Sequence, residues 1–193
     1  STRDARKVCG DALEMRGGIG YVEEFATPRL LRDAHLGSIW EGTGNIIALD
    51  AITRAIGRHH AEGALAADLH ARLQEASSLP ASYRDHLRKL TDRAIAFAQN
   101  VAAKSDNEAD ARRATSMLYH MSSAVVMAWE GEQILAKRGD ARRLLLSKLV
   151  VDHHLTARDP FAASAGKAEE DVASLLLNDA PVSKEKAVAY LGM

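Results

Sequence analysis

The sequence predicts an all-α chain, and three features of its 193 residues indicate this class. Apolar residues recur at i, i+3 and i+4 through most of the chain, which is the spacing of one buried helix face. No stretch shows the alternation of β-branched and polar residues that marks a half-buried strand. Each of the four prolines stands at an expected helix boundary, and these are Pro28, Pro80, Pro160 and Pro181.

Three helices are expected in the first part of the chain. The apolar stripe begins at the start of the sequence with no visible capping residue, so we expect a chain that is cut within a helix. Thr27 before Pro28 is typical of an N-cap followed by the first helical position. Gly57 is expected to end the third helix as a C′ glycine. The expected helices run to about residue 15, from about 28 to 39 and from about 43 to 56.

The rest of the chain is expected to form a series of further helices. A long apolar stripe runs from Tyr83 to Val101, and a second runs from Ala114 to Ala128 in a helix that Gly139 ends. The expected helices span about residues 61–76, 83–101, 108–138, 140–157, 168–177 and 184–191.

Composition and charge exclude several classes of protein. The chain has 25 basic and 26 acidic side chains, a balance that argues against a polycation built to coat nucleic acid. Residues 58–158 are mildly positive, with 15 basic and 12 acidic side chains, so a local contact with nucleic acid stays open. With Cys9 as its one cysteine, no apolar run of about 20 residues and no signal peptide, the sequence predicts a cytoplasmic protein without a membrane span.

The stretch from Gly17 to Asn45 carries the residues that point to chemistry. Gly17, Gly18 and Gly20 would let the backbone approach either a ligand or a neighbouring helix, and both interpretations stay open. No strand precedes these glycines, so they are not a dinucleotide-binding fingerprint.

Glu41 stands between Trp40 and Gly42 at an expected break between two helices. Partial desolvation of a carboxylate beside a large aromatic ring would favour a general base near neutral pH. The amides of the next residues, Thr43 and Gly44, would suit an anion or a polar ligand edge at the start of a helix. The alternative is that Glu41 only caps its own helix, and from the residues alone this alternative is favoured.

Three motifs in this stretch closely resemble the C-terminal end of the acyl-CoA dehydrogenase family, in order and spacing as well as in composition. The resemblance covers about residues 1–57. It implies the last helices of the family's C-terminal four-helix bundle, followed by an appended helical bundle at residues 58–193. The motifs are Gly17-Gly18-Ile19-Gly20-Tyr21-Val22-Glu23-Glu24, Pro28-Arg29-Leu30-Leu31-Arg32-Asp33-Ala34 and Ile39-Trp40-Glu41-Gly42-Thr43.

The resemblance implies an FAD-dependent dehydrogenase that oxidises acyl-CoA to 2-enoyl-CoA. Glu41 would be the catalytic base that removes the α-proton, and Gly42 would lie beside the substrate. One FAD-binding segment would be Thr43, Gly44 and Asn45, and a second, reaching the FAD of a neighbouring subunit, would be Glu14, Met15, Arg16, Gly17 and Gly18. The family often has glutamine where Glu14 stands, and a carboxylate there would repel a pyrophosphate.

The resemblance also implies partners. They are a homo-oligomer, usually a tetramer, and an electron-transfer flavoprotein as electron acceptor. The 193 residues alone are expected to be inactive, because the family's β domain and first helical domain are not among them. Trp40, Gly44 and Asn45 most resemble the alkylation-response branch, so the alternative function is a flavin-containing, DNA-binding protein with little dehydrogenase activity.

Two further patterns are interpreted as structural. Trp129-Glu130-Gly131 repeats Trp40-Glu41-Gly42 but lies inside a long apolar helix, and we interpret it as chance. His59-His60 and His153-His154 are neighbours on expected helices, where adjacent side chains point about 100° apart and chelate poorly. No metal site is predicted.

Overall fold

The structure is a computed structural model that describes residues 2–40, 42–104, 106, 108–157, 159, 161 and 166–191. These residues form helices and no strands, which confirms the all-α prediction. They divide into two compact units, residues 1–50 and residues 51–193. Within the part of the chain described here, no helix is both long and apolar enough to cross a membrane.

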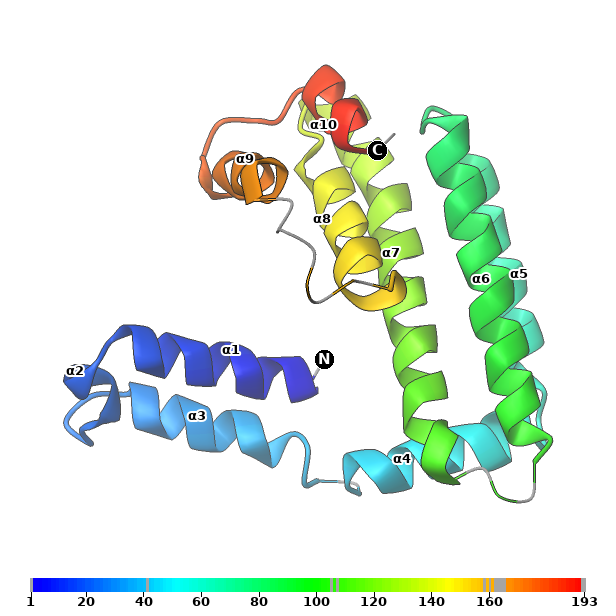
Figure 1. Cartoon of the computed structure of the whole chain (residues 1–193), viewed down its shortest axis with the longest axis horizontal. Helices are drawn as coiled ribbons and strands as arrows, with labels where there is room; N and C mark the ends of the chain where they lie inside the picture. The colour runs from blue at the N-terminus through cyan, green and yellow to red at the C-terminus, as the bar shows by residue number, and fades with distance from the viewer. Residues whose placement is uncertain are drawn as a thin grey trace. The chain divides into compact units, whose positions relative to one another are not determined.

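The first unit is a pair of helices with a short helix at each break. Helices α1 (Thr2–Met15) and α3 (Thr27–Leu36) lie side by side, with α2 (Gly18–Tyr21) in the connection and α4 (Gly44–Asp50) after α3 (Figure 1). Helix α1 buries none of its residues, and α3 buries only Pro28. The sequence of α1 is therefore amphipathic, but its apolar face is not buried in a core of this unit.

The start of α3 differs from the sequence prediction. Thr27 is not the N-cap: Ala26 holds that place, in a right-handed helical conformation. The reason is that the Ala26 carbonyl accepts the bond from the Leu30 amide at 3.0 Å, one residue earlier than expected. Pro28 still falls in the first turn, where its missing N–H costs no hydrogen bond.

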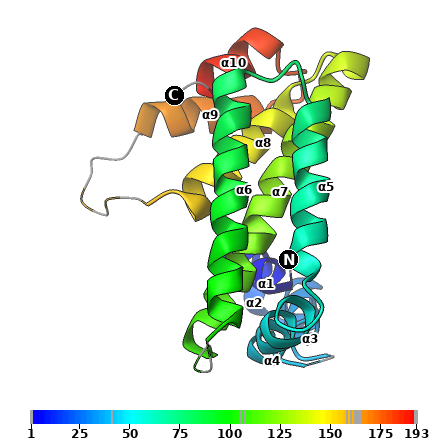
Figure 2. The same ribbon diagram turned by 90° about the vertical axis from the view of Figure 1, so that its right-hand side faces the viewer.

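The second unit is a helical bundle built mainly on three long helices. Helices α5 (Ala61–Glu75), α6 (Ala81–Ala102) and α7 (Glu108–Arg138) pack against one another (Figure 2). Helix α8 (Arg142–Val150) packs on α7, and α9 (Gly166–Leu177) and α10 (Lys184–Leu191) pack on α8. The core side chains that are almost fully buried include Leu69, Leu73, Leu87, Met121, Val125, Leu144 and Leu145.

Two expected α-helices end in a wider, π-helical turn. The turn η1 (Ala51–Ile56) follows α4, and η2 (Val151–Leu155) follows α8. Gly57 is not a left-handed C′ residue as predicted, because its amide bonds to the Ile52 carbonyl at 2.9 Å and continues the π pattern. The left-handed residue is His60, with φ 50°, directly before α5. Gly139, with φ 68°, ends α7 as expected.

The turn η1 belongs to the core of the second unit. It packs against α5, α6 and α7, and its Ile52 is fully buried there. The boundary between the two units therefore lies after residue 50, whereas the sequence places the boundary between domains after residue 57. The turn η1 lies between these two positions.

Candidate functional site

The turn between α1 and α2 holds the first predicted cofactor segment. Gly17 has φ 58°, which favours glycine, and its amide bonds to the Glu14 carbonyl at 2.9 Å. A Cβ at Gly20 would overlap the Leu13 carbonyl of α1, so this glycine is explained by close helix packing. A Cβ at Gly18 would meet no atom within 4 Å. Packing within the chain therefore explains Gly20 and backbone conformation explains Gly17, whereas neither explains Gly18.

The second predicted segment lies between α3 and α4. Gly42 has φ 108°, a conformation that strains any other residue. The Thr43 carbonyl accepts the Ile47 amide at 3.0 Å, so α4 begins here. Gly44 and Asn45 then form the first turn of α4. The predicted base, Glu41, lies outside the described residues.

Trp40 was expected to help desolvate the neighbouring carboxylate. Its side chain is 66% exposed, so this chain does not bury it.

The structure does not bring the two predicted segments together. A Cβ at Gly37 would lie 3.2 Å from Thr2, and one at Gly44 would lie 3.9 Å from the Arg3 side chain, so the second segment is at the beginning of α1. The first segment is at the other end of α1, near α2 (Figure 1). The 12-residue separation between Arg3 and Met15 corresponds to about 18 Å along the helix axis. One copy of the chain therefore does not close a single pocket with both segments.

An ion pair that the sequence analysis missed fixes the connection after α2. The Arg32 guanidinium donates to both Glu23 carboxylate oxygens, at 2.7 and 3.2 Å. The hydrogen bonds from Arg32 lower the pKa of Glu23 below its ordinary value. Both residues lie in motifs that carry the family resemblance, and their opposite charges were the available signal. The pair links two of these motifs, because it joins the connection after α2 to helix α3.

The first unit exposes much of its apolar surface. Met15 is 89% exposed, although it was expected on the apolar stripe. Contiguous exposed apolar surface on a domain usually marks an interface. The large apolar side chains that are at least about one-third exposed in this unit are Val8, Met15, Ile19, Tyr21, Val22, Phe25, Leu30, Leu36, Ile39, Trp40, Ile46 and Ile47.

In the second unit, the repeated Trp-Glu-Gly sequence has a packing role. The Trp129 indole donates to Glu75 at 2.7 Å, the Arg143 guanidinium donates to Glu130, and a Cβ at Gly131 would lie only 2.6 Å from the Leu144 side chain. These contacts join α7 to α5 and α8. The repeat is thus explained by helix packing, in keeping with its interpretation as chance.

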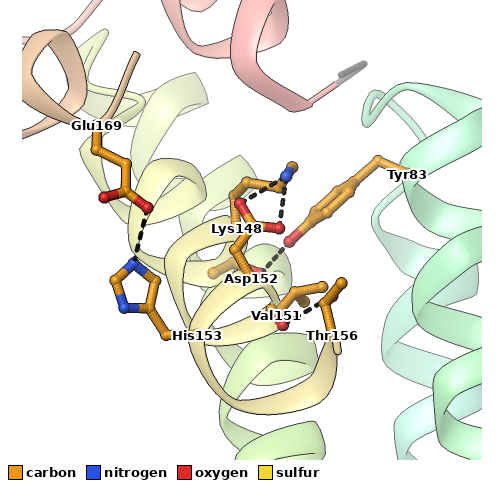
Figure 3. Close-up of polar contacts among 8 residues, drawn as sticks. Tyr83, Lys148, Val151, Asp152, His153, Thr156 and Glu169 are labelled. Carbon is orange, nitrogen blue, oxygen red and sulfur yellow. Dashed lines mark hydrogen bonds and ion pairs between the residues drawn. The ribbon is translucent and has the colours of Figure 1, made fainter. Parts of the chain in front are cut away.

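Polar side chains of α8 and η2 form several contacts (Figure 3). The Lys148 ammonium donates to both Asp152 oxygens at 2.7 and 2.6 Å, and His153 approaches Glu169 at 3.9 Å. No group of three His, Cys, Asp or Glu side chains arranged to hold a metal ion occurs among the described residues.

Buried hydroxyls link α6, α7 and α8. The Tyr83 hydroxyl is 2.7 Å from the Ser147 hydroxyl, which donates to the Ala124 carbonyl at 2.6 Å. Burial raises the pKa of Tyr83 well above its ordinary value. Tyr83 is part of the core of the second unit.

The fold and the site define a helical segment with a glycine-containing turn at each end of α1 and many exposed apolar side chains. Residues 1–57 match the sequence model of the family described as "Acyl-CoA dehydrogenase, C-terminal domain". This match confirms the resemblance for that part of the chain.

Individual relatives agree with the family match. AidB of Escherichia coli (strain K12) is 55% identical over 42 residues, which are 22% of this chain and 8% of AidB. Acyl-CoA dehydrogenase family member 11 of Caenorhabditis elegans is 42% identical over 50 residues, 26% of this chain and 8% of the relative. Butyryl-CoA dehydrogenase of Syntrophomonas wolfei subsp. wolfei (strain DSM 2245B / Goettingen) is 40% identical over 43 residues, 22% of this chain and 7% of the relative.

These matches cover less than one-eighth of each relative's length. The similarity to AidB agrees with the predicted branch of the family. No solved structure matches the chain.

Proposed function

We propose that this chain is the C-terminal part of an FAD-dependent acyl-CoA dehydrogenase. The observation that carries the proposal is the family match over residues 1–57, a stretch that includes every predicted site residue from Glu14 to Asn45. The similarity to a butyryl-CoA dehydrogenase supports an acyl-CoA thioester as the class of substrate.

The two predicted cofactor segments fit a flavin in part. Gly17 and Gly42 have the positive φ angles that let a backbone turn close to a ligand. Gly18, Gly44 and Asn45 are proposed as cofactor contacts from the family match. Glu14 is the one poor fit, because its carboxylate would repel a pyrophosphate. Met15, Arg16 and Gly17 are proposed to contribute the rest of the first segment.

The separation of the segments supports binding to two different flavins. Because they lie at opposite ends of α1, one segment would serve the subunit's own FAD and the other the FAD of a neighbouring subunit. The exposed apolar side chains of this unit supply the surface that a homo-oligomer would cover.

In the proposed mechanism, Glu41 removes the α-proton of the acyl-CoA thioester. The electron pair of the α C–H bond becomes the α,β double bond of the 2-enoyl-CoA product as the β-hydrogen leaves with its own electron pair, as hydride. When bound, FAD supplies the hydride acceptor, and its electrons are proposed to pass on to an electron-transfer flavoprotein. Gly42 would allow the thioester to approach the backbone. A base needs a positioned and dry site, so the groups that cover Trp40 are part of the proposal.

The test uses the full-length flavoprotein that carries these 193 residues. A panel of acyl-CoAs is added without oxygen, and the absorption band of the oxidised flavin is followed. We expect bleaching in the parent and a rate lower by about 100-fold or more in Glu41→Gln, because the base is lost. Glu24→Gln, an exposed carboxylate of the same unit, is the matched control and should bleach normally. The isolated chain should not bleach flavin at all.

The alternative is a flavin-containing DNA-binding protein with little dehydrogenase activity. The similarity to AidB agrees with the branch of the family from which this alternative is taken. Bound flavin that no acyl-CoA bleaches, together with salt-sensitive binding of duplex DNA, would move the assignment to this alternative.

A further inference from the structure

A groove between α6 and α7 has no role in the proposed function. Its volume is about 540 Å³, and Leu155 of η2 also contributes to its lining. Leu90 and Ala94 form a buried apolar floor, whereas the apolar side chains of Phe97 and Met117 are only half-buried. The volume falls within the range of about 300–1,000 Å³ that is usual for small-molecule sites, which are mostly apolar with a few placed polar groups.

The charged side chains that line this groove are cationic, and Asn100 adds an uncharged polar group. Arg93 and Arg113 line it, and the Arg113 guanidinium lies 4.7 Å from the centre of the Phe97 ring. The Asp110 carboxylate neutralises Arg113 at 3.2 Å but is also approached by Lys104 at 4.0 Å, so one carboxylate is shared by two cations.

Arg93 adds a further positive charge. It makes no ion pair with any residue that the structure describes, and no acidic side chain is among the described residues that line the groove. The groove thus combines an apolar floor with an excess of positive charge. This combination is complementary to a ligand that has a long apolar part and an anionic end.

We propose that the α6–α7 groove binds a fatty carboxylate. Its chain would lie along Phe97 and Met117, and its carboxylate would be bound by Arg93 and Arg113. A guanidinium presents paired N–H donors that match the two oxygens of a carboxylate, which favours this anion over an uncharged lipid. The site lies in the part of the chain beyond the family match, so a test of fatty carboxylate binding does not depend on the proposed flavin chemistry.

Calorimetric titration of the 193-residue chain with dodecanoate, below its micelle concentration, tests the proposal. We expect saturable binding of one equivalent, with dodecanol weaker by about tenfold or more because the charge-assisted bonds are lost. Each methylene removed from the chain should weaken binding by up to about fourfold if that group is buried. Equal binding of dodecanol or of dodecyltrimethylammonium would overturn the assignment, and so would binding of anionic vesicles without binding of the free carboxylate.

Variants locate the binding to this groove. Arg93→Gln combined with Arg113→Gln should weaken dodecanoate binding by about tenfold or more. Arg138→Gln, an exposed arginine in the last turn of α7, is the matched control and should leave the affinity unchanged.

A second variant does not depend on the arginines. Met117→Trp fills the groove with a larger side chain, and its thermal unfolding reports whether the bundle still folds. Loss of dodecanoate binding in a folded Met117→Trp chain is the expected result. Unchanged affinity in both the folded Met117→Trp chain and the double arginine variant would refute the groove as the site.

Discussion

The two units of this chain bury their side chains in different ways. The second unit has a core of nearly inaccessible leucines, valines and alanines drawn from α5 to α10. The first unit also has amphipathic helices, yet α1 buries no residue and α3 buries only one. An apolar stripe therefore predicts that a helix forms, but it does not predict what that helix packs against. The unit that overlaps the family match is thus the one that leaves most of its apolar side chains exposed.

The largest expected effect separates the two units directly. Leu87→Ala removes a fully buried side chain and should lower the free energy of unfolding by about 2–5 kcal/mol. Leu30→Ala removes a side chain that is 57% exposed and should change it by less than about 0.5 kcal/mol. Denaturant titration of the 193-residue chain, followed by circular dichroism, measures both. A cost at Leu30 equal to that at Leu87 would show that the first unit buries its own core.

A glycine in the second unit tests the closeness of helix packing. In Gly131→Ala, the new Cβ would lie 2.6 Å from Leu144 Cδ2 and 3.0 Å from the Leu144 backbone nitrogen. Overpacking of this kind should cost about 1–3 kcal/mol of unfolding free energy.

Gly63→Ala in α5 is the matched control for Gly131→Ala. Its Cβ would meet nothing within 4 Å, so the change should stabilise the chain by about 0.5–1 kcal/mol through the higher helix propensity of alanine. Equal stabilisation by both substitutions would mean that helix propensity, and not the contact with Leu144, decides the result.

How far the sequence predicts the structure differs between fold and site. The helices from residue 61 to 138 followed from apolar spacing, because that spacing is what builds the core of the second unit. The π-helical turns η1 and η2 could not be predicted in this way, since an apolar stripe does not distinguish an i+4 from an i+5 hydrogen bond. The prediction of Thr27 as the N-cap was wrong, because a favourable capping residue does not decide which carbonyl accepts the first hydrogen bond of the helix.

Of the candidate site, the sequence predicted only that its glycines occupy special backbone positions. Gly17 and Gly42 have the positive φ angles that glycine permits, whereas Gly20 is set by a contact with α1 that no local pattern reveals. The role of Glu41 stays a prediction from the family resemblance. The groove at Arg93 and Arg113 was not predicted, because it needs two helices whose pairing the sequence does not specify.

A smaller effect concerns the pH dependence of the second unit. Burial raises the pKa of Tyr83 in the folded chain, so its stabilising contribution is complete below the unfolded pKa of about 10 and is lost as the pH rises. Tyr83 should then contribute a fall in unfolding free energy of up to about 1.4 kcal/mol per pH unit above about pH 10. In Tyr83→Phe this contribution should disappear, at a cost near neutral pH of about 1 kcal/mol for the lost hydrogen bond with Ser147. Tyr119→Phe, a change at a more exposed tyrosine, is the control, and an alkaline slope that persists in Tyr83→Phe would contradict the assignment.

The smallest expected effect belongs to the first unit, where the Glu23–Arg32 pair stands in solvent. The hydrogen bonds from Arg32 hold the pKa of Glu23 below its ordinary value, so the pair favours the folded loop at neutral pH and this effect is lost as acid protonates Glu23. Arg32→Gln should return the pKa of Glu23 toward that of a free glutamate, as measured by carboxyl NMR titration. The nearby Arg29→Gln, which removes a longer contact of 3.7 Å with Asp33, should leave the pKa of Glu23 in place. High salt should reproduce part of the effect of Arg32→Gln, because exposed ion pairs are screened, and it should leave the alkaline transition at the buried Tyr83 much less changed. A Glu23 pKa that moves with neither Arg32→Gln nor salt would mean that the loop after α2 is held by some other contact.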